Sequence, residues 1–422
     1  MKPKKILIMG VIGNALEFYD FTLYGVFASI IANYYFPGSN ETAKLLASLA
    51  AFGAGFFTRP FGGMVFGYIG DRYGRKKALS LSILLMGVPT ILMGIMPGYE
   101  TMGLWASGVI LVCRLLQGLC TGGEYNGAAI FSIEHLGKKF PGFIGGWIAG
   151  SCALGAFFAI LLGSLTQRVG MPSWAWRIPF LIGGAISFFG YFIRRNATET
   201  PEFLNAQKNT PLKTSLLKVF ASNPKSCLTA FGLGGINGAL SYTLLSFLTV
   251  YLARYLKLPM FQAMQLNLVG MFGFMAGSPL MGYLFDKVGH KRFYQSVALA
   301  IFCLALPIFK AISSLSIPLI ILGELLLGIA TASIAGSGHA YMQTLFPVHD
   351  RYRGISFNFS VGMALFGSMT PLIYVKMIEQ NHATLLFPGY FLMGVSLLFS
   401  LLNALTRSPK TSQSEVINPT VK

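Results

Sequence analysis

A short basic motif occurs twice in this chain and constrains its fold more than any other feature. The first copy, at residues 67–77, is GYIGDRYGRKK, and the second, at residues 282–292, is GYLFDKVGHKR. Each copy follows one long apolar segment and precedes another, so one helical half is written twice. Internal duplication of a helical membrane half is typical of secondary transporters. We therefore expect two matching bundles of helices.

The composition indicates that the chain uses lipid as its solvent. With 54% hydrophobic residues, 11% charged residues and a mean hydropathy of +0.62, its 422 residues carry too few polar groups to cover a water-soluble globule. About 20 apolar residues cross a bilayer as a helix, which satisfies the backbone polar groups within the segment. Twelve spans are predicted, at 7–32, 45–70, 78–97, 103–125, 142–166, 178–194, 226–253, 264–285, 294–313, 316–340, 353–378 and 386–406.

The predicted fold is an all-α integral membrane protein with twelve transmembrane helices in two pseudo-symmetric six-helix bundles. The N-terminal bundle covers residues 1–194, and the C-terminal bundle covers residues 226–406. The polar stretch between them, residues 195–225, is expected to be a cytoplasmic linker loop. The tail at 407–422 has no apolar period and is expected to be disordered. The first apolar run carries acids and lacks a cleavage pattern, so we interpret it as a retained helix.

The net charge of +18 does not predict a nucleic-acid partner, because the cations lie in short loops. Most of the 32 Lys and Arg residues fall at the two termini and in the loops that follow even-numbered spans. Positive charge stays on the cytoplasmic side of a membrane, so both termini are predicted to be cytoplasmic. All five cysteines fall within or at the edge of predicted spans, which indicates no disulfide framework.

Four further motifs occur in order along the chain. They are GNALEFYDF at 13–21, TRPFGG at 58–63, GGEY at 122–125 and ETPEF at 199–203. Together with the repeated basic loop, they resemble the major facilitator superfamily and, within it, the metabolite:proton symporters. That group includes proline/betaine, shikimate, 2-oxoglutarate and citrate permeases. The chain departs from the group at Phe18 and Tyr125, where Trp is usual, and at Val288 and His290 in the second basic loop.

The resemblance implies a function and a location. It implies proton-coupled symport, by alternating access, that imports a small organic acid or zwitterionic metabolite across the bacterial cytoplasmic (inner) membrane. We further expect a monomer in the lipid bilayer, a carboxylate or zwitterion as the small-molecule substrate, protons as the coupling ion, and no cofactor or metal.

Other functions are alternatives to import. An exporter that antiports protons against a metabolite or drug would share the fold, but such antiporters commonly carry Gly-Pro in the fifth helix, whereas here Gly150 precedes Ser151. A receptor or scaffold that transports nothing is a third reading. An enzyme is not expected, because no nucleophile with a base, metal-ligand cluster or cofactor loop is recognisable. The chain has no phosphate-binding loop, which argues against an ATP-driven pump.

The repeated loops are predicted to form a cytoplasmic gate. An acid at a cytoplasmic helix end can pair with neighbouring cations and with the other bundle, and such a latch must open for release. The alternative is that the cations only fix topology. The candidate gate residues are Asp71, Arg72, Arg75, Asp286, Lys287 and Arg292.

Two acids in the first helix are candidates for proton coupling. Glu17 and Asp20 lie three residues apart and share a face, and Tyr24, a substrate-binding candidate, continues it. Glu17 lies roughly 15 Å into its span, where a carboxylate must pair, face water or hold a proton. A buried carboxyl that has a cation nearby can load and release protons. The alternative is a structural ion pair with Arg59 or Arg114.

Arg59 and Arg114 lie near mid-depth in the second and fourth spans. The guanidinium keeps its charge and matches a carboxylate in a bidentate way, so each arginine is either a substrate clamp or the standing partner of a buried acid. In the fourth span, Gln117 and Glu124 extend a polar stripe from Arg114. Gln117 is a substrate-binding candidate, and Glu124 is a further candidate proton carrier.

The second half partly echoes the first. Glu324 occupies the position that Arg114 holds in the first half, and it is the last candidate proton carrier. His339 and Tyr125 are candidates for contact with the substrate. The alternatives are packing within the helices for His339 and a place near the external interface for Glu324. Aromatic residues are numerous, and some of them could cage a quaternary ammonium, but their spacing selects none.

Overall fold

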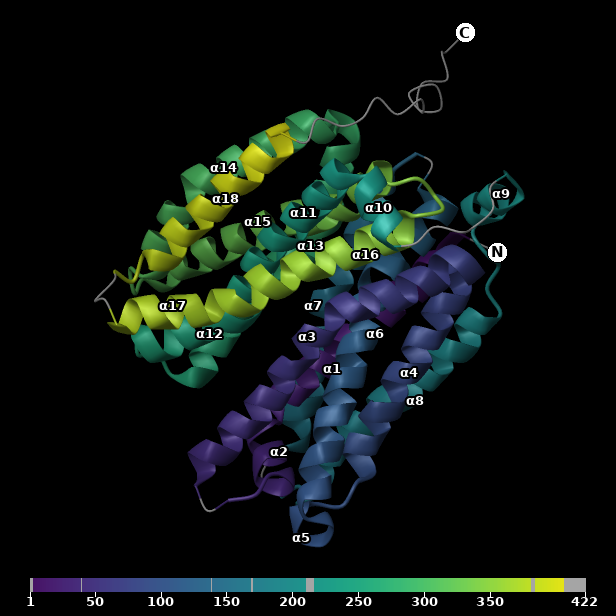
Figure 1. Cartoon of the computed structure of the whole chain (residues 1–422). Coiled ribbons are helices and arrows are strands. Elements are labelled where there is room, and N and C mark those ends of the chain that lie inside the picture. The colour runs from purple at the N-terminus through teal and green to yellow at the C-terminus, as the bar shows by residue number, and fades with distance from the viewer. Residues whose placement is uncertain are drawn as a thin grey trace.

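The computed structural model describes residues 3–38, 40–137, 139–167, 170–209, 216–380 and 384–405. Over these ranges all regular secondary structure is helical, and no strand occurs in them. The predicted all-α membrane class is therefore confirmed, whereas the tail at 407–422 lies outside the described residues. Figure 1 shows the long helices in two groups, purple to teal for one and teal to yellow for the other.

The first group, which we call the N-half, contains the helices up to residue 195. They are α1 (Pro3–Val26), α2 (Ala28–Tyr35), α3 (Glu41–Tyr73), α4 (Arg75–Ile95), α5 (Tyr99–Met102), α6 (Leu104–Leu136), α7 (Pro141–Thr166), the 3-10 turn η1 (Ala175–Arg177) and α8 (Ile178–Arg195). The predicted first span is divided at Phe27 into α1 and α2. The predicted fourth span is too short, because α6 continues past residue 125 through small and apolar side chains that are buried inside the protein.

The polar stretch after α8 is more ordered than the predicted loop. It contains α9 (Pro201–Asn209) and α10 (Leu216–Ser222). Thr200 starts α9 as its N-cap, because its hydroxyl accepts a hydrogen bond from the backbone of Phe203 at 3.3 Å. Pro201 fits the first helical position, where a missing N–H costs nothing. The sequence of the predicted loop at 195–225 therefore contained a helix-capping pattern, Thr200 followed by Pro201, which its overall polarity did not reveal.

The second group, the C-half, begins at residue 224 and is interrupted by π-helical turns. Its elements are α11 (Pro224–Tyr242), the π turn η2 (Thr243–Phe247), α12 (Leu248–Val250), the π turn η3 (Tyr251–Tyr255), α13 (Met260–Val288), α14 (His290–Ile312), α15 (Ile317–Leu345), α16 (Arg351–Gly362), the π turn η4 (Met363–Gly367), α17 (Ser368–Gln380) and α18 (Phe387–Leu405). Such turns are rare and occur frequently at functional sites.

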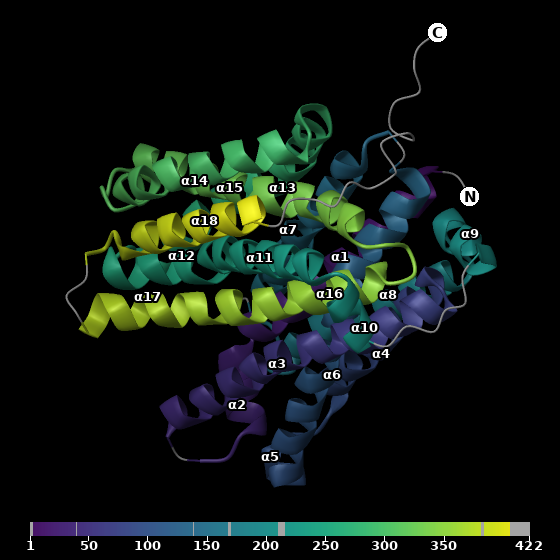
Figure 2. The same ribbon diagram turned by 45° about the horizontal axis from the view of Figure 1, so that its top comes forward.

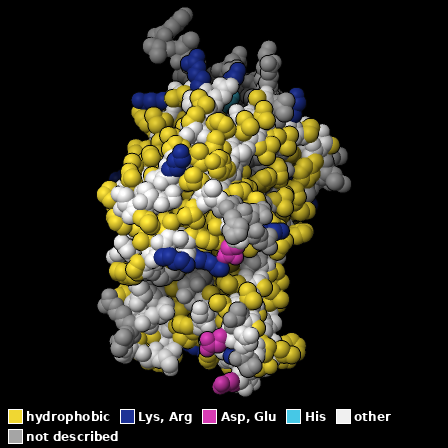
Figure 3. Space-filling model, turned by 90° about the vertical axis from the view of Figure 1, so that its left-hand side faces the viewer, with side chains coloured by type: hydrophobic (Ala, Val, Ile, Leu, Met, Phe, Trp, Pro, Cys, Tyr) yellow, Lys and Arg dark blue, Asp and Glu magenta, His cyan; other side chains and the backbone are white. Residues whose placement is uncertain are grey.

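Eleven of the described helical stretches are long and apolar enough to cross a membrane. The remaining predicted span, 45–70, falls in α3, which has 33 residues but is not among the eleven. Arg59 and several glycines in its middle lower its hydropathy. The surface fits contact with lipid, since hydrophobic side chains cover most of the face in Figure 3.

The two halves meet along α7 against α13 and along α3 against α16. The backbones approach closely at small residues, since a Cβ added at Gly146 would lie 2.3 Å from the carbonyl oxygen of Ser278. In Figures 1 and 2 the halves converge near α9 and α10 and diverge toward α2 and α5 on one side and α12 and α17 on the other. We call these the converging end and the diverging end.

Candidate functional site

A small cavity lies between the two halves. Its volume of about 10 Å³ is near the minimum for one water molecule, so the conformation seen has no room for a metabolite. The N-half contributes side chains from α1, α3 and α6, and the C-half contributes side chains from α16 and η4. The lining residues are Glu17, Phe18, Arg59, Thr121, Tyr125, Asn126, Phe359, Ser360 and Met363.

An ion pair lines this central cavity. Arg59 Nη2 lies 3.7 Å from Glu17 Oε1, and both side chains are buried. Neither Glu17 oxygen accepts a hydrogen bond, and Arg59 Nε donates none, within the described part of the chain. Arg59 also reaches the C-half, where its Nη1 lies 3.5 Å from the hydroxyl of Tyr242. A buried pair with unused donors and acceptors costs free energy, so both groups can gain from a ligand or a proton.

Asp20 and Arg114 belong to a second polar group, outside the residues that line the cavity. Thr90 Oγ1 lies 2.7 Å from Asp20 Oδ2, Gln117 Nε2 lies 2.9 Å from Thr90 Oγ1, and Arg114 Nη1 donates to Gln117 Oε1 at 2.8 Å. The residues therefore form a chain of contacts from α1 through α4 to α6. Sequence reasoning did not find Thr90, because nothing distinguishes a single threonine in an apolar span.

Aromatic rings surround the Arg114 guanidinium. Its Cζ lies 4.5 Å from the ring centres of Phe21 and Tyr24 and 4.9 Å from that of Phe52. The predicted substrate candidate Tyr24 thus packs on Arg114 and does not line the cavity. Phe21 also lies 4.7 Å from the Cζ of Arg59, so one ring separates the two cations. Arg114 makes no ion pair with any described residue.

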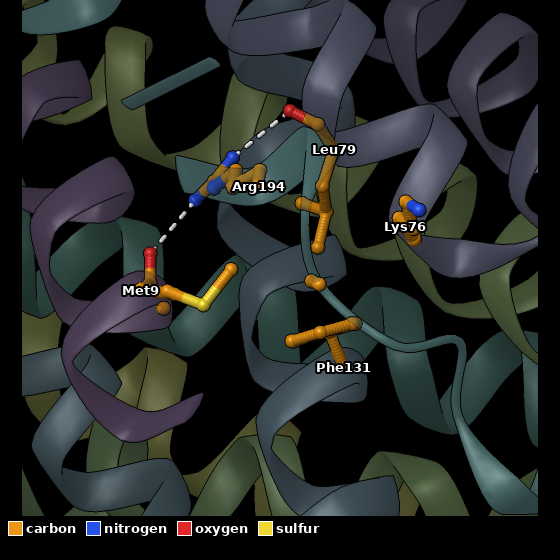
Figure 4. A pocket seen from close by; sticks show the side chains of 7 residues that line it. Met9, Lys76, Leu79, Phe131 and Arg194 are labelled. Atoms are coloured by element: carbon orange, nitrogen blue, oxygen red, sulfur yellow. Dashed lines mark hydrogen bonds between the residues drawn. The ribbon is translucent and has the colours of Figure 1, made fainter. Parts of the chain in front are cut away.

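Glu124 has a partner that the sequence did not suggest. Arg194 donates to both of its carboxylate oxygens, at 2.6 and 2.8 Å, and Ser82 adds a hydrogen bond at 2.6 Å. Arg194 also donates to the carbonyls of Met9 and Leu79, as Figure 4 shows in a slot beside Lys76 and Phe131. Arg194 is the last residue of the predicted sixth span, and the structure buries its side chain near the end of α8. Neither Arg59 nor Arg114 is the partner of Glu124.

His339 and Tyr125 meet across the two halves. Their ring centres are 4.5 Å apart, and Tyr125 also contacts Phe359 at 5.6 Å and Phe18 at 6.2 Å. His339 is buried, and its Nε2 has no hydrogen-bond partner within the described ranges. Three of these rings line the cavity beside Arg59. Glu324, in contrast, lies apart from the cavity, buried within the C-half.

A buried ionic network joins the halves at the converging end. Asp71, at the end of α3, lies 3.1 Å from Arg75 Nη1 and 3.2 Å from Arg353 Nε. The backbone N–H groups of Tyr352 and Arg353, at the start of α16, donate to the same carboxylate at 3.1 and 3.0 Å. The structure therefore brings Asp71 of the N-half and α16 of the C-half together, as a gate requires.

Glu134 is a second acid in this network that sequence reasoning missed. Its carboxylate pairs with Arg75 at 3.3 Å and with Arg351 of the C-half at 3.0 Å, and Arg351 also pairs with Glu202 of α9. The residue was missed because the predicted fourth span ended before it. The cations Arg351 and Arg353 were interpreted only as topology markers.

The ETPEF motif braces the same end of the protein. Glu199 Oε1 accepts hydrogen bonds from the backbone N–H groups of Arg75 and Lys76, at 3.1 and 3.3 Å, and so caps α4. Burial raises the pKa of the Glu199 carboxyl above its ordinary value, and hydrogen bonds from the backbone of Thr200 and Lys76 oppose that shift. Thr200 donates to Glu134 at 2.6 Å, which ties the linker to the ionic network.

The second basic loop works differently from the first. Asp286 accepts hydrogen bonds from the backbone N–H groups of Gly142 and Phe143, at 2.7 and 2.9 Å, at the start of α7. It therefore joins the halves through a helix N-terminus, where the backbone favours negative charge. Three predicted gate residues are not brought into the network. Arg72, Lys287 and Arg292 are exposed and form no ion pair with a described residue.

No group of three or more His, Cys, Asp or Glu residues that could hold a metal ion occurs within the described ranges. Around the central cavity, the groups that could contact a charged ligand are Arg59 and the rings of Phe18, Tyr125 and Phe359.

Comparisons with known proteins agree with this architecture. The chain matches the family model described as Major Facilitator Superfamily over residues 10–371 and 231–420. It is 32% identical over 412 residues to the proline/betaine transporter of Escherichia coli (strain K12), covering 94% of this chain and 82% of that protein. It is also 32% identical over 409 residues to the glycine betaine/proline/ectoine/pipecolic acid transporter OusA of Dickeya dadantii (strain 3937), covering 94% and 81%.

Solved structures share the fold. The proton:xylose symporter XylE bound to 6-bromo-6-deoxy-D-glucose matches with a TM-score of 0.73 at 15% identity, covering 96% of both chains. The human organic anion transporter MFSD10 matches with a TM-score of 0.70 at 14% identity, covering 95% of this chain and 99% of that one.

Proposed function

This chain belongs to the Major Facilitator Superfamily and is a secondary transporter of a small metabolite, and from that premise we propose that it imports its substrate together with protons. The Glu17–Arg59 pair in the central cavity is the observation that most supports the proposal. It joins a carboxylate and a guanidinium cation at 3.7 Å, in a cavity between the halves that alternating access would move.

The chemistry of the pair explains how a proton and a solute could load together. Arg59 keeps its charge and offers a planar fork that suits a carboxylate. A substrate carboxylate bound to Arg59 would take the place of Glu17. Arg59 is the one cation that pairs with Glu17 among the described residues, and an acid displaced from its cation inside an apolar site is stable only with a proton bound. Substrate binding and protonation of Glu17 would therefore favour each other.

The cavity suits a small zwitterion better than a di- or tricarboxylate. Of Arg59 and Arg114, the two arginines near mid-depth, only Arg59 lines the cavity, so the lining offers one permanent cation for one carboxylate. The rings of Phe18, Tyr125 and Phe359 lie in the same lining, and aromatic faces attract organic cations. This arrangement fits the names of the relatives, which include proline and betaine. The cavity must enlarge before such a molecule enters.

We test coupling with the variant Glu17→Gln, which keeps the shape of the side chain and removes its proton chemistry. Protein in liposomes is given labelled proline, glycine betaine or an organic acid under an inside-alkaline pH gradient. We expect gradient-driven accumulation by the wild type and its collapse with an uncoupler. We expect Glu17→Gln to keep counterflow exchange and to lose accumulation, at least tenfold below the wild type.

The exposed acid Glu100 on α5 supplies the matched control, since Glu100→Gln removes a charge far from the cavity. The control should accumulate substrate like the wild type. Accumulation without a proton gradient, or accumulation driven by sodium, would falsify proton coupling. Substrate efflux driven by an inward proton gradient would instead support the exporter.

A further inference from the structure

We propose that Glu324 is a second proton-binding site, separate from the central cavity, which loads and releases one proton in each transport cycle. The proposal rests on the proposed function, because it assumes that transport is coupled to protons. Glu324 lies on α15 with none of its surface exposed. Neither carboxylate oxygen has a hydrogen-bond partner, and no cation forms an ion pair with it, within the described part of the chain.

The elements packed around Glu324 present no charge to it. On α13, Gly270 faces the carboxylate so closely that an added Cβ would lie 2.6 Å from Oε2. The same added Cβ would lie 2.6 Å from the Leu244 side chain of η2. The amide of Asn267 on α13 donates to the Leu244 carbonyl at 2.8 Å. On α14, Lys310 is exposed and forms no ion pair with a described acid.

An ionised carboxylate in such a place would have no cation beside it and only the neutral amide of Asn267 as a neighbouring donor, at a cost of several kcal/mol. The same group with a proton bound is neutral and costs far less. Glu324 is therefore protonated in this conformation. No ion pair with a described residue explains an acid at this position, and a buried carboxyl of this kind can carry a proton.

The π turn η2 connects Glu324 to the central cavity. Tyr242, directly before η2, meets Arg59 at 3.5 Å across the halves, and its ring lies 5.4 Å from that of Phe56. Two residues later, Leu244 lies beside Gly270, next to the Glu324 carboxylate. A ligand that moves Arg59 would also move Tyr242. Because Tyr242 directly precedes η2, Leu244 would then shift relative to Glu324. Such turns are rare and occur frequently at functional sites.

Glu324 is also placed for access from the diverging end. It lies seven residues after Ile317, where α15 begins, which corresponds to about 10 Å along the helix. A movement of η2 away from α13 would open a short path from that end. A proton could then enter from one side, and the closed conformation would hold it without a counterion.

The test is a measurement of proton stoichiometry in liposomes with the membrane potential held at zero. One pH unit corresponds to about 1.4 kcal/mol, so each coupled proton supports about a tenfold accumulation of substrate at equilibrium. We expect Glu324→Gln to accumulate about tenfold less substrate than the wild type at the same gradient, with counterflow preserved. Glu324→Asp, which keeps an acid, should recover most of the wild-type ratio.

Glu379→Gln serves as the matched control, because Glu379 is an exposed acid of the C-half that pairs with Arg254. Its accumulation should equal that of the wild type. If Glu324→Gln does not insert, Glu324→Met provides another neutral side chain for the apolar site and should show the same tenfold loss. Equal ratios in the wild type and the neutral variants would overturn the proposal, as would loss of counterflow together with accumulation. If wild-type uptake ignores the pH gradient, the proposed function fails first.

Discussion

The buried acids of this transporter differ in how their charge is compensated. Glu17 has one cation at 3.7 Å and no hydrogen bond among the described residues, whereas Glu124 is held by Arg194 at two points. Glu324 has no cation among them. A tight bidentate pair is costly to break, so Glu124 suits a structural role. A loose or absent partner leaves the acid able to exchange a proton.

The Glu124–Arg194 pair should therefore govern stability more than coupling. We expect Arg194→Gln to lower the free energy of unfolding by about 3–5 kcal/mol, because it leaves a buried carboxylate unpaired. Glu124→Gln combined with Arg194→Gln should cost less than the two changes added together. Unfolding of the purified protein by heat or denaturant measures both. If Glu124→Gln keeps its stability but loses proton-driven accumulation, Glu124 is a proton carrier after all.

At the scale of helices, the helix cap formed by Asp286 stabilises a contact between the halves for which the sequence predicted a charge pair. Both acids of the repeated motif looked like partners for cations, yet Asp286 binds the start of α7 and only Asp71 binds arginines. The repeat predicted where the halves meet, because both acids do link them. It could not predict how, since the partner of Asp286 is a backbone that carries no sequence signal.

Removing the cap on α7 should loosen the converging end. We expect Asp286→Ala to raise the rate at which this end opens by roughly 2- to 30-fold, since a lost cap costs about 0.5–2 kcal/mol. Asp286→Asn keeps one acceptor oxygen and should have a smaller effect. The measurement is maleimide labelling of a cysteine placed at Ser278, a buried position where α13 meets α7. Native Cys303 is exposed and is replaced first. Equal labelling of all three proteins would show that the cap does not hold this end closed.

For the whole molecule, the sequence revealed the fold well and the site in part. Apolar spans and a repeated motif are local signals, so twelve helices in two groups followed from them. Depth along a span predicted that Glu17 and Arg59 would be buried, and the structure pairs them. The contacts of Arg351 and Arg353 could not be foreseen, because they depend on how the halves dock. The π turns also leave no pattern in the sequence.

The converging end is closed only when the two halves dock. The network around Asp71 should therefore determine how much of the protein has this end closed. Asp71→Asn removes the charge that faces Arg75 and Arg353, so we expect this end to open more often, by a factor above ten. Transport should slow while membrane insertion stays intact. The distance between spin labels at Lys77 and Lys291, exposed on opposite halves near this end, should lengthen. Arg72→Gln is the matched control, because Arg72 is adjacent in sequence but exposed. If Asp71→Asn leaves both the distances and uptake at wild-type values, or if Arg72→Gln changes them equally, the network is not the latch and the repeated cations serve topology alone.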